Sequence, residues 1–237
     1  MDQPVTQQSL SRIGAIRQSL SLMSGNILVL SITDLLGNFS RRLVFPYVSL
    51  YILALGGTAA QIGLVTALAP LAGLLVFPLG GYIADHANRV RLIVLAGVYM
   101  SFLVLLRGLA PSWEFIAVAA LIQGVVAIQF PARSALIADS LSPENRGKGI
   151  AMMNTIATTL AIFAPYLAGI IVDRYGPNLG VRMLYAVMFT TTISATLIHW
   201  RFLKEPTPTT GKTASRGIQF SALSNTLREA YRASPPC

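Results

Sequence analysis

Long apolar segments separated by short polar ones dominate the pattern along the chain. A helix needs about 20 residues to cross a bilayer core of about 30 Å, and every segment is long enough. No Asp, Glu, Lys or Arg occurs from Leu43 to Ala84, a stretch that fits two spans joined by a tight turn. The pattern predicts an all-α membrane protein with six transmembrane helices, near residues 28–55, 60–80, 91–110, 114–138, 149–172 and 181–202.

The charge distribution agrees with this prediction. Only 11% of the 237 residues are charged, against about a quarter in a soluble domain. The net charge of +9 is scattered among apolar segments, so nucleic acid is not expected as a partner. If the N-terminus is cytoplasmic, twelve Lys and Arg lie inside and three, Arg107, Arg174 and Arg182, lie outside. This bias follows the positive-inside rule, and we expect both termini in the cytoplasm and the bundle in a prokaryotic plasma membrane.

The polar segments at the two ends divide the chain into three regions. Residues 1–26 are expected to be a cytoplasmic segment, residues 27–203 the six-helix bundle, and residues 204–237 a cytoplasmic linker. Within the linker, residues 218–232 fit either an amphipathic helix on the membrane surface or a disordered basic tail. The single cysteine, Cys237, excludes a disulfide within the chain. No phosphate-binding loop, metal-ligand pattern or catalytic motif is present, so neither a cofactor, nor a metal, nor enzymatic activity is expected.

Ionisable residues at bilayer depth are costly unless they face a cavity or a partner. At about 100° per residue, the polar residues of the first span share one face: Ser31, Asp34, Asn38, Arg41, Arg42 and Ser49. This face is expected to line a pathway for substrate or protons, although a packed interface in which Arg41 compensates Asp34 is the alternative. Arg133 lies at a depth similar to that of Asp34, so an ion pair between the two is possible.

Weaker polar signals occur in the later spans. Span five carries Asn154, Thr155, Thr158 and Thr159, which can bind a substrate or be satisfied within their own helix. His199 and Trp200 indicate an interfacial anchor. Four glycines suggest close contacts between helices: Gly63, Gly73, Gly80 and Gly97.

A short motif follows span two and has a partial copy after span five. Residues 80–91 read GGYIADHANRVR, and Gly81, Asp85 and Asn88 are repeated 88 positions later as Gly, Asp and Gly. Spans two and five would run in opposite directions, so the offset favours a three-plus-three inverted repeat.

This motif resembles the signature loop between helices two and three of the major facilitator superfamily. Gly81, Asp85 and Arg89 match, whereas Asn88 stands where the family has Gly, and Asn also tolerates a left-handed turn. Residues 131–149 resemble the end of the family's fourth helix, which implies that Asp139 faces Arg89 in an inner-gate loop. The chain would thus form the N-terminal half of a twelve-helix fold, as a natural half or a truncated sequence.

The resemblance also implies a function. Residues 164–169, APYLAG, are similar to an element of the fifth helix in proton-coupled antiporters, but Ala120 replaces a basic residue expected in the fourth helix. We expect a secondary transporter that works by alternating access, with proton-coupled efflux of drugs or organic anions; Arg41, Arg42 and Arg133 favour an anion. The expected partners are the bilayer, a small-molecule substrate, protons, and a second six-helix half or second copy. A non-transporting receptor or scaffold is the alternative.

Overall fold

The computed structural model describes residues 24–205, apart from the side chains of residues 84–86, and every regular element in this part is helical. The segment 218–232 lies outside the described residues. The elements in order are α2 (Gly25–Val44), η1 (Phe45–Tyr47), α3 (Val48–Ala54), α4 (Ala59–His86), α5 (Arg89–Gly108), α6 (Trp113–Gln123), η2 (Gly124–Ile128), α7 (Gln129–Ser140), η3 (Pro143–Asn145), α8 (Arg146–Thr159), η4 (Leu160–Ile162) and α9 (Ala164–Phe202).

Several helical runs are interrupted at residues that disturb regular hydrogen bonding. Pro46 lies in the 3₁₀ turn between α2 and α3, because proline has no N–H to donate to the preceding turn. Gly176 has φ 78° and ψ 164° inside α9 and is followed by Pro177, so the backbone changes direction there. The break at η1 also means that Ser49 cannot be placed by continuing the angular pattern of α2. The position of Ser49 on the polar face therefore stays a prediction.

Four helical runs in the described chain are long and apolar enough to cross a membrane. They are Ala59–Ile83, Arg89–Gly108, Trp113–Ser140 and Pro143–Phe202. The last has 60 residues, about 90 Å at 1.5 Å per residue, which is three times the thickness of a bilayer core. Residues 24–205 are therefore an all-α part of a membrane protein.

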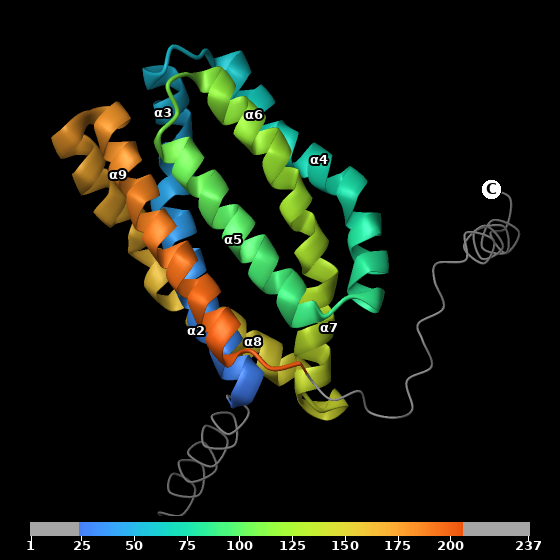
Figure 1. The fold of residues 1–237 in the computed structure, drawn as a ribbon. Coiled ribbons are helices and arrows are strands. Elements are labelled where there is room, and N and C mark those ends of the chain that lie inside the picture. Colours follow the sequence, from blue (N-terminus) through green and yellow to red (C-terminus); the bar gives the residue numbers. More distant parts are fainter. Residues whose placement is uncertain (1–23, 206–237) are drawn as a thin grey trace, which may run out of the picture. The chain divides into compact units, whose positions relative to one another are not determined.

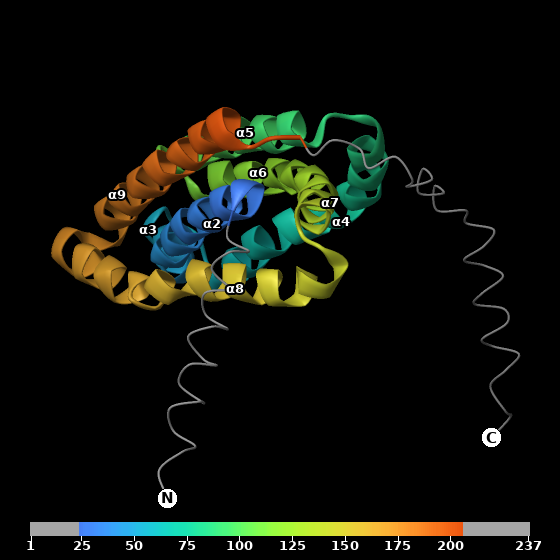
Figure 2. The same cartoon turned by 90° about the horizontal axis from the view of Figure 1, so that it is seen from below.

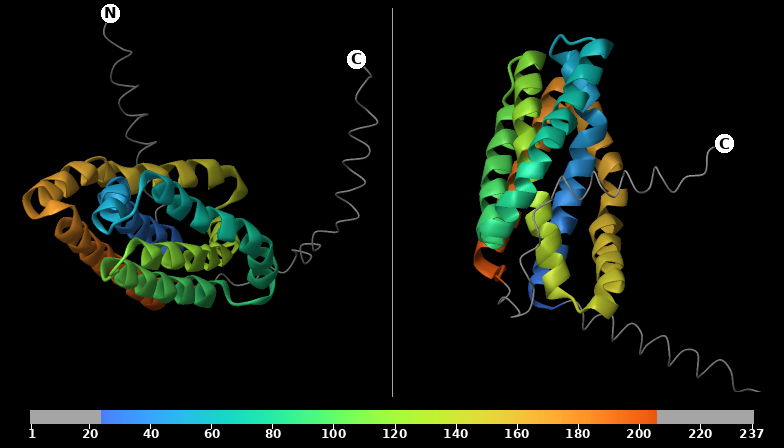
Figure 3. Two further views of the ribbon diagram at one scale, coloured as in Figure 1. Left: turned by 90° about the horizontal axis from the view of Figure 1, so that it is seen from above. Right: turned by 90° about the vertical axis from the view of Figure 1, so that its right-hand side faces the viewer.

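The helices run lengthwise beside one another (Figure 1). Viewed along the bundle, α2 lies between α8 and the C-terminal part of α9, while α4 packs against α6, η2 and α7 (Figure 2). The two further views in Figure 3 show the same order. One cluster of buried apolar side chains surrounds Tyr51 and Ile52, and a second, around Leu30, Ile93 and Leu136, joins α2, α5 and α7. The position of α2 at the centre brings its polar residues within reach of several helices.

The predicted glycine contacts are correct at only some positions. A Cβ on Gly80 would lie 2.8 Å from the Cα of Ile128, and one on Gly97 would lie 2.5 Å from the Oγ1 of Thr196. These two glycines therefore permit close approach of helices. Gly63 and Gly81 have no atom of the described chain near the position of a Cβ, so the predicted contact role is wrong for Gly63.

Candidate functional site

An ion pair joins α2 to α7 inside the bundle. The guanidinium of Arg133 donates to both carboxylate oxygens of Asp34. About a quarter of each side chain is exposed, 24% for Arg133 and 25% for Asp34. Because each charge is largely shielded from solvent, the two compensate each other in a setting where an isolated charge would be expensive. The pairing that the sequence left open is therefore present in the structure.

A second link to α2 lies one residue away. The ring Nε2 of His199 on α9 is 2.8 Å from the Oγ1 of Thr33, and both residues are buried. The Thr33 hydroxyl is also 3.0 Å from the carbonyl oxygens of Val29 and Leu30. A hydroxyl has one hydrogen, so donation to a carbonyl leaves its oxygen to accept from the imidazole N–H.

His199 is therefore not an interfacial anchor, and that interpretation was wrong. Its neighbour Trp200 is 71% exposed and keeps the outward position expected of such a residue. The two point in different directions from α9, one into the bundle and one outward. The adjacent polar residues Thr33 and Asp34 of α2 likewise contact different helices. The signal available in the sequence was that the chain has only two histidines, one of which falls within a predicted span.

The remaining residues of the predicted polar face do not share one environment. The side-chain amide of Asn38 donates to the backbone carbonyl of Asp34 at 3.0 Å, within its own helix. Arg41 and Arg42 are exposed, and within residues 24–205 neither forms an ion pair. The alternative in which Arg41 compensates Asp34 is therefore wrong. Ser31 is buried, at 1% exposure.

The motif loop forms a second ion pair, between the start of α5 and the end of α7. Arg89 donates to Asp139 at 2.6 Å, as the resemblance implied. Asn88 has φ −64° and ψ 116°, and its side chain accepts from the N–H of Arg91 at 2.8 Å. Asn88 is thus an N-cap in extended conformation, and the expected left-handed turn is wrong. The side chain of Asp85 lies outside the described part.

Two contacts at this end of the bundle were not predicted. A carboxylate oxygen of Glu205 accepts from the backbone N–H of Val90 at 3.0 Å, which stabilises the first turn of α5. Asn26 donates to the backbone carbonyl of Lys204 at 2.7 Å and accepts from its N–H at 2.9 Å. The residues that follow α9 are therefore tied to the beginnings of both α2 and α5.

The polar patch of span five lies on α8. Asn154 and Thr158 are exposed, and the hydroxyls of Thr155, Thr158 and Thr159 donate to backbone carbonyls of the preceding turn at 2.7–2.9 Å. The three threonine hydroxyls are thus satisfied within their own helix, and a role of this patch in binding substrate stays a prediction. No group of metal-ligating side chains occurs among the described residues.

The other end of the bundle carries basic and aromatic side chains. Arg182 donates to the carbonyl of Ala110 at 2.7 Å and lies 6.0 Å from the centre of the Tyr51 ring. Tyr51 donates to the carbonyl of Arg107 at 3.3 Å. Arg107 belongs to the last turn of α5, within the predicted span 91–110.

Known proteins with similar sequences extend these observations. Multidrug resistance protein MdtG of Serratia proteamaculans is 27% identical over 189 residues, which are 76% of this chain and 45% of that protein. The uncharacterized MFS-type transporter MJ1317 of Methanocaldococcus jannaschii is 28% identical over 199 residues, 82% of this chain and 48% of that protein. This chain thus spans about half the length of these relatives. Residues 30–235 match the Major Facilitator Superfamily, and the chain belongs to that family.

Proposed function

We propose that this chain is one half of a secondary transporter that moves a small solute across the plasma membrane by alternating access. The half comprises six spans arranged as a three-plus-three inverted repeat, residues 27–203, between a cytoplasmic segment and a cytoplasmic linker. The cargo is a drug or an organic anion, and protons are the coupling ion. The activity belongs to the assembly of this chain with a second six-helix half or a second copy.

The observation that carries the proposal is the ion pair between Asp34 and Arg133. Ionisable groups within a membrane protein mark pathways for substrates and ions, and this pair joins two different helices within the bundle. A carboxylate that pairs with an arginine can exchange that partner for a proton, and the arginine can exchange it for an anion. Such an exchange gives two states of the same helices, which transport requires.

The pair formed by Arg89 and Asp139 supports a gate at one end. It joins the first residue of α5 to the last turn of α7, so separation of these helix ends must break it. The N-cap by Asn88 fixes the orientation of the same loop. We assign this end to the cytoplasmic side because Arg89, Arg91, Arg146 and Lys148 lie near it in the sequence.

The six-span arrangement draws support from α8 and α9. A helical run of 60 residues is too long for a single crossing of a bilayer. Gly176 interrupts this run at a position where the backbone changes direction. The first run, from α2 to α3, carries Asp34, Arg41 and Arg42, which explains why it is less apolar than the other four runs. Two relatives of similar sequence are named multidrug resistance protein, which supports efflux of drugs.

Transport by reconstituted protein tests the proposal. The chain is placed in proteoliposomes, alone and with a candidate second half, and flux of an organic anion and of a neutral dye is followed with and without a pH gradient. Asp34→Asn is expected to abolish the dependence on the gradient, because the amide keeps the shape but cannot carry a proton. Asp173→Asn, which changes an exposed carboxylate on α9, is the matched control and is expected to behave as wild type.

The double variant decides between coupling and structure. If Asp34 serves only to neutralise Arg133, Asp34→Asn combined with Arg133→Gln restores gradient-driven flux that the single change loses. Such recovery would remove the coupling role. Specific binding with no flux under any gradient would favour a receptor instead.

A further inference from the structure

Two polar residues next to each other on α2 reach two different helices. Thr33 bonds to His199 of α9 at 2.8 Å, and Asp34 pairs with Arg133 of α7. Neighbouring residues of a helix point about 100° apart, so the two contacts hold α2 from two directions. A rotation of α2 by about 20° would move the end of a side chain by about 2 Å, which is enough to break a hydrogen bond. Each contact therefore depends on the rotation that the other one maintains.

Further contacts hold α9 in place beside α2. A Cβ on Gly97 of α5 would lie 2.5 Å from the Oγ1 of Thr196, so α5 and α9 are in close contact about one turn before His199. Beyond the end of α9, the backbone of Lys204 bonds to the side chain of Asn26 at 2.7 and 2.9 Å. Asn26 shares the face of α2 that contacts α9, because it precedes the threonine by about two turns. The imidazole thus belongs to a helix that is fixed on both sides of it.

Apolar packing does not by itself select one rotation of α2. Lipid tails are as apolar as the interior of the bundle, so apolar faces of a helix distinguish weakly between a neighbour and lipid. A hydrogen bond is directional, and a buried polar group that loses its partner costs free energy. His199 and Thr33 are only 8% and 4% exposed, so solvent is a poor substitute for either partner. The bond between them therefore favours one rotation over its neighbours.

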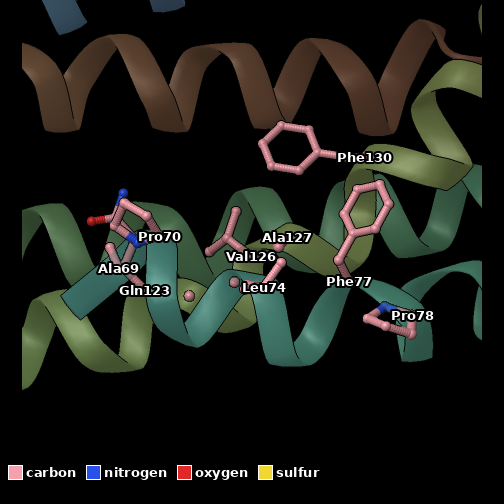
Figure 4. Close-up of a pocket in the computed structure, with 11 residues that line it drawn as sticks. Ala69, Pro70, Leu74, Phe77, Pro78, Gln123, Val126, Ala127 and Phe130 are labelled. Atoms are coloured by element: carbon pink, nitrogen blue, oxygen red, sulfur yellow. The ribbon is translucent and has the colours of Figure 1, made fainter. Parts of the chain in front are cut away.

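Arg133 depends on that rotation, because the other side of α7 offers it no counter-charge. Toward α4, α7 borders a groove lined by apolar side chains such as that of Phe130 (Figure 4), and none of the lining residues is ionisable. In the described part of the chain, the ion pair of Arg133 is with Asp34. The ring of His199 is itself within electrostatic reach of Arg133. Helices α2, α7 and α9 thus meet at one cluster of polar side chains.

We propose that His199 is a positioning residue of the ion-pair site: its bond to Thr33 holds α2 at the rotation in which Asp34 faces Arg133. Helix α9 thereby takes part in a site whose charges lie on α2 and α7. The inference rests on the proposed function in assigning a role at that site, but the effect of His199 on the ion pair exists in the resting protein and requires neither a gradient nor a second half.

A double-mutant cycle on Asp34 and Arg133, repeated in variants of His199, tests the proposal. Unfolding by SDS in mixed micelles gives the unfolding equilibrium constant with Asp34→Asn, with Arg133→Gln and with both changes. In the wild-type background the coupling between the two changes is expected to be about 30-fold in that constant. With His199→Leu it is expected to fall to about threefold, because α2 can then turn. His199→Gln keeps an N–H donor in nearly the same place and is expected to retain the coupling.

Two further variants remove single hydroxyl groups. Thr33→Val deletes the partner of His199 with little change of shape and is expected to lower the coupling to about threefold as well, which keeps the test valid if His199→Leu fails to fold. Thr196→Val is the matched control, since its buried hydroxyl bonds to the carbonyl of Thr192 in the same helix at 2.8 Å. This control is expected to leave the coupling unchanged, whatever it does to overall stability.

The proposal is overturned if His199→Leu and Thr33→Val lower stability but leave the coupling between Asp34 and Arg133 intact, because His199 then serves packing alone. It is also overturned if His199→Gln loses as much coupling as His199→Leu, since the hydrogen bond is then not the cause. These measurements need no flux. A chain that shows the expected loss of coupling and yet transports nothing under any gradient would contradict the proposed function and leave the role of His199 standing.

Discussion

Replacing Asp34 by asparagine leaves Arg133 without its counter-charge in the interior of the bundle. An exposed ion pair contributes about 0–1 kcal/mol, and breaking a fully buried pair costs about 3–5 kcal/mol. The side chains of this pair are 24% and 25% exposed, which places it between the two cases. The oxygen of the introduced amide still accepts a hydrogen bond from Arg133, so we expect a loss of about 2 kcal/mol in the free energy of unfolding.

The cost is measured by titration with SDS in mixed micelles, with fluorescence of Trp113 and Trp200 as the signal. A double-mutant cycle adds Arg133→Gln and the double variant Asp34→Asn with Arg133→Gln. The coupling energy is expected to be about 2 kcal/mol, because the double variant has no unpaired charge to bury. Asp173→Asn, on the exposed surface of α9, is the control and should change stability by less than about 0.5 kcal/mol.

A coupling energy below about 0.5 kcal/mol would refute the reasoning, since the pair would then behave as a solvent-exposed one. Equal destabilisation in the single and double variants would also contradict it. In that case the loss would arise from packing and not from an uncompensated charge.

Further perturbations test other parts of the structure. Gly80→Ala is expected to lower the free energy of unfolding by about 1–3 kcal/mol, because its Cβ would meet the backbone of η2. Gly81→Ala, whose Cβ would face open space, should leave stability unchanged or raise it by up to about 1 kcal/mol. Thermal unfolding midpoints of the two variants are compared. Arg41→Gln and Arg42→Gln should each weaken binding of an anionic cargo more than that of a neutral one, as measured by competition in nanodiscs, and equal weakening would contradict the assignment. Cys237, the one thiol of the chain, should react with an impermeant maleimide in inside-out vesicles and not in intact cells; labelling of intact cells would place the C-terminus outside.

Several features could be predicted from the sequence because they depend on local composition. The helical, membrane-embedded nature of the chain followed from long apolar segments, and the resemblance to the major facilitator superfamily followed from the motif around Arg89. Both are confirmed. The similar depth of Asp34 and Arg133 also followed from position along each span, and the structure joins them. The roles of these residues as pathway and gate stay predictions.

Contacts that depend on helix rotation could not be predicted in the same way. A polar wheel drawn on the first span placed Arg41 and Arg42 on the face of Asp34, but it could not show that Asp34 pairs with α7 while both arginines stay exposed; the pathway role of this face stays a prediction. His199 was assigned to the interface with Trp200, although a difference of one residue turns it into the core. The contact between Glu205 and the first turn of α5 joins residues 115 positions apart, and no local signal marks it.

The sequence by itself determined that the chain forms apolar helices in a bilayer and that its family motif lies between two of them. The tertiary structure alone decided which face of each helix meets a partner. The physical reason is that lipid tails are as apolar as a protein interior, so a membrane helix such as α4 is hydrophobic all round and its pattern does not distinguish neighbour from lipid. Only the packed backbones, with Gly80 against η2 and Gly97 against α9, fix the rotation that brings Thr33 to His199 and Asp34 to Arg133.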